Sequence, residues 1–87
     1  MYKILFHKRT SDDIANLKAA KLDGKARLLI DILRQNPLQN PPPYEKLVGD
    51  MEGLYSRRIN HKHRLVYKVD QANRTVFVLS LWTHYEY

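Results

Sequence analysis

A chain of 87 residues can fill only one modest hydrophobic core, so we expect a single domain spanning residues 1–87. With 44% hydrophobic and 28% charged residues, the composition excludes a chain that is disordered throughout. The absence of cysteine excludes disulfides and thiolate metal sites. Fifteen Lys and Arg against nine Asp and Glu give a net charge of +6, which favours polyanionic partners such as RNA, DNA or an acidic protein, although charge also serves solubility alone.

The chain begins with a short alternating segment. Tyr2, Ile4 and Phe6 alternate with Lys3, Leu5 and His7, which predicts a first strand of roughly six residues. The apolar stretch is too short for a signal peptide or a membrane span, and basic residues follow it at once. We therefore expect a cytoplasmic protein with no membrane partner.

Two helical patterns follow. Thr10 or Ser11 can cap the first helix, whose apolar residues recur at helical spacing: Ile14, Leu17 and Ala20. Asp23-Gly24 interrupts this pattern. The second helix has its apolar residues at i, i+3, i+4 and i+7, namely Ala26, Leu29, Ile30 and Leu33, and ends at Asn36-Pro37. The short separation predicts an antiparallel helical hairpin.

The second half predicts a loop and a β-meander. Residues 37–53 hold four Pro and two of the three Gly without any sustained period, so a loop is expected there. Strand patterns then occupy residues 54–59, 64–69 and 75–82, separated by polar turns. The sequence therefore predicts an α+β fold, with an N-terminal strand and a helical hairpin packed on one face of a four-stranded, mainly antiparallel sheet. The position of the first strand in the sheet stays open.

Strand alternation predicts which side chains face away from the helices, on the outer face of the sheet. In the last strand we expect Phe77, Leu79 and Leu81 to meet the helices. The outer face then receives Val76, Val78, Ser80, Trp82 and His84. On the two preceding strands the same alternation sends outward Ser56, Arg58, Arg64, Val66 and Lys68. Arg58, Arg64 and His84 thus converge by parity.

The two arginines suggest an anion site. If the hairpin is centred near His61, Arg58 and Arg64 lie almost opposite each other, which destabilises a sheet unless an anion separates them. Phosphate is the obvious anion, and Ser56 and Lys68 on the same face are candidate RNA contacts. The plainer alternative is that both arginines are exposed strand residues without a task.

Glu45 completes a set able to cleave RNA without a metal. A carboxylate can take a proton from a 2′-hydroxyl, the His84 imidazole can give one to the leaving 5′-oxygen, and guanidiniums can stabilise the phosphate. Glu45 by itself would be an ordinary loop carboxylate, and no strand parity locates it. Lys46, next to it, is a further candidate RNA contact.

Other polar residues are expected to be structural. Arg57 has the parity opposite to Arg58, so its stem should pack at the sheet edge, with Asp50 or Glu52 as partner. His61 and His63 flank a turn and are expected to be solvated. Their spacing does not suit zinc, so neither a metal nor a cofactor is expected.

The segment over residues 55–67, YSRRINHKHRLVY, is followed by His84-Tyr85 and preceded by Glu45-Lys46-Leu47. This pattern resembles the YoeB/Txe toxins of the RelE superfamily, closely in the second half and only in layout in the helical first half. The resemblance implies a RelE-like fold and a type II toxin that enters the ribosomal A site and cleaves mRNA. It implies Glu45 as general base, Arg58 and Arg64 as phosphate ligands, His84 as general acid and Tyr85 beside the scissile nucleotide.

The resemblance also implies partners: an acidic YefM/Axe-like antitoxin, the ribosome with mRNA, and operator DNA bound by the toxin–antitoxin complex. Whether the chain forms a homodimer stays open. Val48 stands where the family commonly has a lysine, and the chain continues past His84-Tyr85 through Glu86-Tyr87. Two other classes remain: a catalytically inactive interaction module acting as an antitoxin-bound, DNA-binding corepressor, and a simple basic RNA-binding domain.

Overall fold

The computed structural model describes the backbone of residues 1–84 and the side chains of residues 1–82. Its elements, in chain order, are β1 (Lys3–Phe6), α1 (Thr10–Ala19), α2 (Asp23–Gln35), β2 (Glu45–Lys46), the 3₁₀ helix η1 (Gly49–Met51), β3 (Leu54–Arg58), β4 (His63–Asp70) and β5 (Thr75–His84). None of the helices in this described part is long and apolar enough to cross a membrane.

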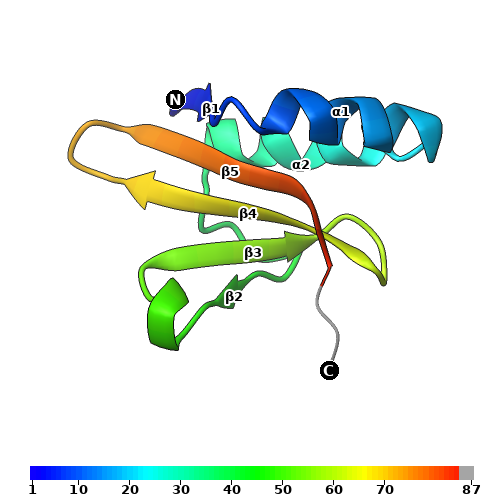
Figure 1. Ribbon diagram of the computed structural model, residues 1–87. Helices are drawn as coiled ribbons and strands as arrows, with labels where there is room; N and C mark the ends of the chain where they lie inside the picture. The colour runs from blue at the N-terminus through cyan, green and yellow to red at the C-terminus, as the bar shows by residue number, and fades with distance from the viewer. Residues whose placement is uncertain (85–87) are drawn as a thin grey trace.

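The elements form one sheet with the strand order β1-β5-β4-β3-β2 (Figure 1). β1 lies at an edge, parallel to β5, whereas the other neighbours are antiparallel. The predicted α+β fold is confirmed, but the sheet has five strands and not four. The additional strand, β2, lies within the expected loop and pairs Glu45 with Ser56 and Lys46 with Tyr55.

Both helices cover the same face of this sheet (Figure 1). α2 places its apolar stripe inward, with Leu33 at 0% exposure and Ala26 at 3%. The buried cluster joins the helices to the sheet and consists of Leu17, Ala26, Leu29, Leu33, Ile59, Leu65, Tyr67, Val76, Val78 and Leu81. The predicted helical hairpin and its packing on one face are therefore confirmed.

The start of α1 differs from the capping prediction. The Thr10 hydroxyl donates to the carbonyl of His7 at 2.7 Å, and the Ser11 hydroxyl donates to the carbonyl of Lys8 at 3.0 Å. Neither hydroxyl accepts a bond from the helix, because the helix begins at Thr10 and the N-cap position falls on Arg9. These hydroxyls instead tie the first turn of α1 to the segment that leaves β1.

β5 contains two register shifts that the sequence pattern did not predict. Tyr67 pairs with Val78, Val66 with Ser80, and Arg64 with Thr83, so β5 has one extra residue at each step. Each extra residue exchanges the two faces of the strand. Val76 and Val78 are therefore in the core at 0% exposure, and the prediction that they face outward is wrong. Phe77 and Leu79 are only partly buried, whereas Leu81 is in the core as predicted.

Asp13 of α1 supports the shifted part of β5. The backbone N–H of Leu81 donates to Asp13 Oδ2 at 2.9 Å, across 68 residues of sequence. A strand residue beside a bulge loses its regular ladder partner, and the carboxylate replaces that partner. The contact thus joins the first turn of α1 to the strand that leads to His84.

Replacing Asp13 by alanine should lower the free energy of unfolding by about 1–3 kcal/mol more than replacing Asp12, because a part-buried N–H loses its acceptor. Asp12 is the matched control, since it lies in the same first turn of α1 and is exposed. Urea denaturation of both variants measures the difference. Equal losses would show that only the helix dipole, and not the bond to Leu81, is affected.

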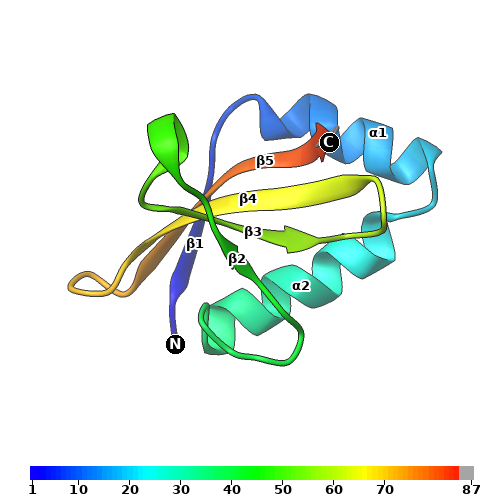
Figure 2. The same cartoon turned by 90° about the horizontal axis from the view of Figure 1, so that it is seen from below.

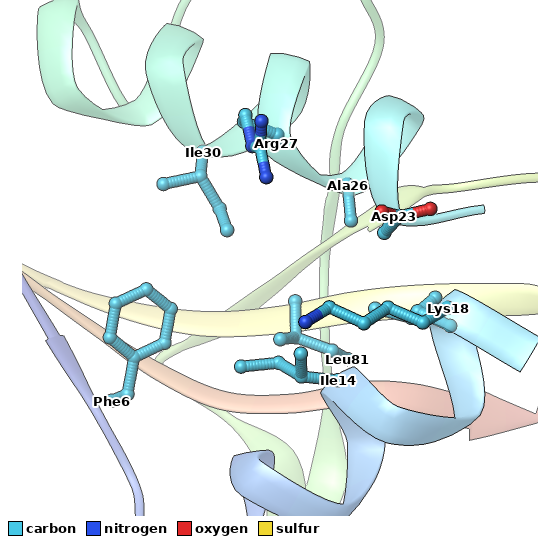
Figure 3. A pocket seen from close by; sticks show the side chains of 9 residues that line it. Phe6, Ile14, Lys18, Asp23, Ala26, Arg27, Ile30 and Leu81 are labelled. Atoms are coloured by element: carbon cyan, nitrogen blue, oxygen red, sulfur yellow. The ribbon is translucent and has the colours of Figure 1, made fainter. Parts of the chain in front are cut away.

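A cavity of about 150 Å³ lies between the two helices and the end of the sheet. Figure 3 shows Ile14, Ala26, Ile30 and Leu81 around it, with Lys18 and Arg27 beside these apolar side chains. Phe6 also lines it, and 46% of the Phe6 surface is exposed. The result is an apolar hollow bordered by two basic side chains, Lys18 and Arg27, and one acidic side chain, Asp23.

Candidate functional site

The short strand β2 gives Glu45 a defined place. Its backbone lies opposite Ser56 of β3, which sets the side chain on the outer face of the sheet. From there Glu45 Oε1 lies 3.1 Å from Nη1 of Arg64 on β4. The arginine side chain is 6% exposed and the glutamate side chain 52% exposed. A carboxylate open to solvent therefore meets a buried guanidinium, although the sequence had offered no location for Glu45.

Ser56 lies beneath this ion pair. Its hydroxyl accepts a hydrogen bond from Arg64 Nη1 at 3.2 Å, and the residue is 0% exposed. Ser56 presents no exposed surface in this structure, and its RNA contact stays a prediction. The outer face is partly covered here: Val66, next to Ser56 in the sheet, is 3% exposed and borders one cavity with Arg9 and Met51. In this structure Ser56 orients Arg64.

The predicted opposition of the two arginines is confirmed. Arg58 and Arg64 are direct partners across β3 and β4. In this structure the anion beside Arg64 is the Glu45 carboxylate, which offsets the repulsion without a ligand. Arg58 is exposed and borders a cavity of about 330 Å³ that also involves Lys25 and Pro42. The Arg64 side chain is thus buried within the site, whereas Arg58 is exposed.

His84 arrives at the same end of the sheet. The register pairs His84 with His63 and the preceding Thr83 with Arg64, so the end of β5 lies beside the start of β4 (Figure 1). The alternation of side chains along β5 does not show on which face of the sheet the His84 imidazole lies, because two register shifts precede His84. The side chain of His84 and the whole of Tyr85 lie outside the described residues, so their predicted roles stay predictions.

The two lysines differ in position. Lys68 is exposed and has the same parity on β4 as Val66, so it lies on the outer face and its RNA contact stays a prediction. Lys46 is also exposed, but it pairs with Tyr55 and alternates with Glu45. Its side chain therefore starts from the opposite face of β2. Lys46 borders a different cavity, together with Val48 and Glu52.

Arg57 is not at the sheet edge as expected. It is 1% exposed and its guanidinium bonds to the backbone carbonyls of residues 37, 39 and 42. The prediction that Asp50 or Glu52 pairs with Arg57 is therefore wrong. Its Nε also donates to the Tyr67 hydroxyl at 3.2 Å, and this hydroxyl donates to the Pro37 carbonyl at 2.8 Å. Burial raises the pKa of Tyr67, whereas the Arg57 charge and its hydrogen bond act in the opposite direction.

His63 was expected to be a solvated turn residue, and this prediction is wrong. It is 6% exposed, and its ring stacks on Trp82 with centroids 3.7 Å apart and planes at 14°. The reason is that β4 begins at His63 and pairs there with the end of β5. Within the part of the chain that the structure describes, no three His, Cys, Asp or Glu side chains come together as a metal site.

Comparison with known proteins places these residues in a family. A family model described as "YoeB-like toxin of bacterial type II toxin-antitoxin system" matches residues 6–85. The chain belongs to this family of YoeB-like toxins. The resemblance found in the segment from Glu45 to Tyr85 is thereby confirmed and extends over the helices as well.

Relatives of this YoeB-like toxin agree in sequence and in structure. Toxin YoeB from Synechocystis sp. is 36% identical over 66 residues, which cover 76% of this chain and 74% of the relative. The YoeB/ParE toxin from Agrobacterium tumefaciens superposes with a TM-score of 0.84 at 30% identity, covering 95% of this chain and 99% of the other. The YoeB-YefM complex from Staphylococcus aureus gives a TM-score of 0.79 at 33% identity, with 98% and 99% covered.

A more distant similarity shows the fold alone. The RelE chain of the archaeal RelE-RelB complex from Pyrococcus horikoshii superposes with a TM-score of 0.75 at 24% identity. Together with the strand order and the helical hairpin, this similarity makes the fold RelE-like.

Proposed function

We propose that this YoeB-like toxin is a ribosome-dependent endoribonuclease that cleaves mRNA in the A site. The observation that supports the proposal best is the contact between Glu45 and Arg64, with Arg58 directly across the strand pair. A base and two cations at one end of a sheet are suited to a phosphodiester with a neighbouring hydroxyl. The backbone of His84 enters the same end of the sheet.

The proposed reaction is an in-line transesterification. The Glu45 carboxylate takes the proton of the 2′-hydroxyl, and the 2′-oxygen attacks the adjacent phosphorus. As the bond from phosphorus to the 5′-oxygen breaks, the His84 imidazolium gives its proton to that oxygen. The products are a 2′,3′-cyclic phosphate and a 5′-hydroxyl. Arg58 and Arg64 stabilise the phosphorane, and by the family resemblance Tyr85 lies beside the scissile nucleotide.

The resting contact between Glu45 and Arg64 suits this reaction. Arg64 is buried and anchored by Ser56, so its guanidinium stays in place when the substrate enters. Buried charges interact more strongly than exposed ones, because water screens them less. The more exposed Glu45 is the partner that can move toward a hydroxyl. An incoming phosphate takes over the role of the carboxylate as the anion beside Arg64.

Primer extension on translated mRNA tests the proposal. The parent protein should produce cuts within ribosome-bound codons, and His84→Ala and Glu45→Ala should each slow cutting by about 10²–10⁴-fold, the usual contribution of a general acid or base. His61→Ala and Glu52→Ala are the matched controls, since both residues are exposed and lie outside the ion pair. These controls should cut like the parent.

Each rival function has a different signature in the same assay. A corepressor without catalytic activity gives no cut with parent protein. A basic RNA-binding domain binds free RNA with strong salt dependence and is indifferent to His84→Ala. Cutting by both His84→Ala and Glu45→Ala at the parent rate would exclude the proposed acid and base.

We further propose an acidic antitoxin as partner, as in the YoeB-YefM complex of Staphylococcus aureus. The net charge of +6 supports an acidic partner. The hollow of Figure 3 offers such a partner apolar contacts, with two cations, Lys18 and Arg27, and one carboxylate, Asp23, beside them. Because the proposed target is the ribosome, the proposed site of action is the cytoplasm.

A further inference from the structure

The proline-rich segment before β2 accepts three hydrogen bonds from one side chain, Arg57. Nη1 donates to the Pro42 carbonyl at 2.6 Å, and Nη2 donates to the carbonyls of Pro37 at 3.0 Å and Gln39 at 2.7 Å. With its Nε on Tyr67, the guanidinium uses all three of its nitrogens. These bonds link β3 to a segment that lies 15 to 20 residues earlier in the chain.

This segment depends on bonds of that kind. Pro41, Pro42 and Pro43 have no N–H, so they can donate no backbone hydrogen bond of their own. Their carbonyls and those of the preceding residues need donors from elsewhere when they are buried. A planar guanidinium can serve several carbonyls at once in a fixed geometry, whereas an ammonium acts as a point charge. Arg57 thereby fixes the path of residues 37–42. These residues belong to the segment that connects α2 with β2 in Figure 2.

The fixed segment leads directly to Glu45. Tyr44 comes between them, and its ring lies 5.1 Å from Cζ of Arg57 and 5.7 Å from the Tyr55 ring. β2 itself is only two residues long, so its own pairing gives Glu45 little support. The direction from which the chain enters β2 therefore controls where the Glu45 carboxylate meets Arg64.

We propose that Arg57 is a positioning residue for Glu45, acting through the proline-rich segment and Tyr44. This inference rests on the proposed role of Glu45 as general base. Arg57 points toward the helices, away from the face that carries Arg64, so it acts without touching RNA. Consecutive residues of β3, which face opposite sides of the sheet, then support the two partners separately: Ser56 orients Arg64, and Arg57 orients Glu45.

Arg57→Lys tests the proposal, because lysine keeps the positive charge but lacks the planar guanidinium whose N–H groups reach three carbonyls. The rate of mRNA cutting at saturating protein should fall by about 10–100-fold, the effect of a displacement of about 1 Å at a catalytic group. The protein concentration that gives half of the maximal cutting rate should change by less than about twofold, since Arg58 and Arg64 still hold the phosphate. Arg34→Lys is the matched control, because the Arg34 guanidinium pairs with Asp31 at 2.9 Å on the surface of α2.

The same substitution in a Glu45→Ala background separates positioning from stability. If Arg57 acts through Glu45, Arg57→Lys should leave the residual rate of Glu45→Ala unchanged within about twofold. A purely structural role predicts the same fold-loss of cutting rate in both backgrounds, because the substitution then lowers the fraction of folded protein equally in both. That additive outcome would overturn the proposal, as would cutting at the parent rate by Arg57→Lys.

Tyr67→Phe provides a second, milder variant if Arg57→Lys folds poorly. It removes the hydroxyl that bridges Arg57 and the Pro37 carbonyl and keeps the buried ring. We expect about a 3–10-fold slower cut in the parent background and no change in the Glu45→Ala background. Equal effects in both backgrounds would again reject positioning. If instead Glu45→Ala itself cuts at the parent rate, the proposed base role of Glu45 fails together with this inference, whereas the proposed nuclease function fails only if the parent protein produces no cut.

Discussion

Arg64→Lys should slow mRNA cutting on the ribosome by about 10²–10³-fold, the loss measured when one transition-state donor is removed. The guanidinium reaches both Ser56 and Glu45 through Nη1, at 3.2 and 3.1 Å. A lysine ammonium keeps the charge but lacks the planar fork that can hold these partners and two phosphate oxygens together. The rate at saturating protein, followed by primer extension, is the quantity to compare.

Arg74→Lys is the matched control for Arg64→Lys. Arg74 is exposed in the turn between β4 and β5, at the opposite end of these strands from Arg64 (Figure 1). The control should cut like the parent. Urea denaturation of both variants at the assay temperature shows whether each is folded there, so that the rates refer to native protein. An Arg64→Lys protein that is folded and cuts at the parent rate would contradict the phosphate-binding role.

Leu33→Ala should lower the free energy of unfolding by about 2–5 kcal/mol, because it leaves a cavity in a core that cannot collapse freely. Leu33 is 0% exposed and belongs to the cluster that joins α2 to the sheet. Total stabilities of small domains are only about 5–15 kcal/mol, so much of the variant should be unfolded at moderate urea concentration. Denaturation followed by circular dichroism measures the loss.

Leu28→Ala on the same helix is the control for this prediction. Leu28 is 64% exposed, so its truncation should change the free energy of unfolding by less than about 0.5 kcal/mol. The pair compares one residue type on two sides of one helix. Similar losses for both variants would show that α2 does not pack through the stripe that includes Leu33.

The helices could be predicted well because their signals are local. The i, i+3, i+4 spacing of Ala26, Leu29 and Leu33 determines the buried face of α2 in any compact fold, and all three are in the core. The three C-terminal strands were likewise predicted within two residues at each end. β2 was not predicted, because two residues carry no measurable period and acquire strand geometry only by pairing with β3.

The faces of β5 were predicted wrongly in its first half for a related reason. Parity assumes an uninterrupted ladder, and the two extra residues opposite β4 violate that assumption. Val76 and Val78 are chemically as suited to a core as Phe77 and Leu79, so the pattern by itself could not decide between the two sets. The bulged segment is stabilised by Asp13, a residue of α1 that no local rule connects with Leu81.

For the candidate site, the sequence by itself determined which chemical groups are available. The family membership, the base and acid of the proposed reaction and the two arginines on facing strands follow from residue types and their order. Only the tertiary structure decided how they meet. It paired Glu45 with Arg64, buried Ser56 beneath them and turned Arg57 toward the proline-rich segment. The physical reason is that these contacts join residues 8 to 20 positions apart, so they depend on strand pairing and burial and leave no local pattern.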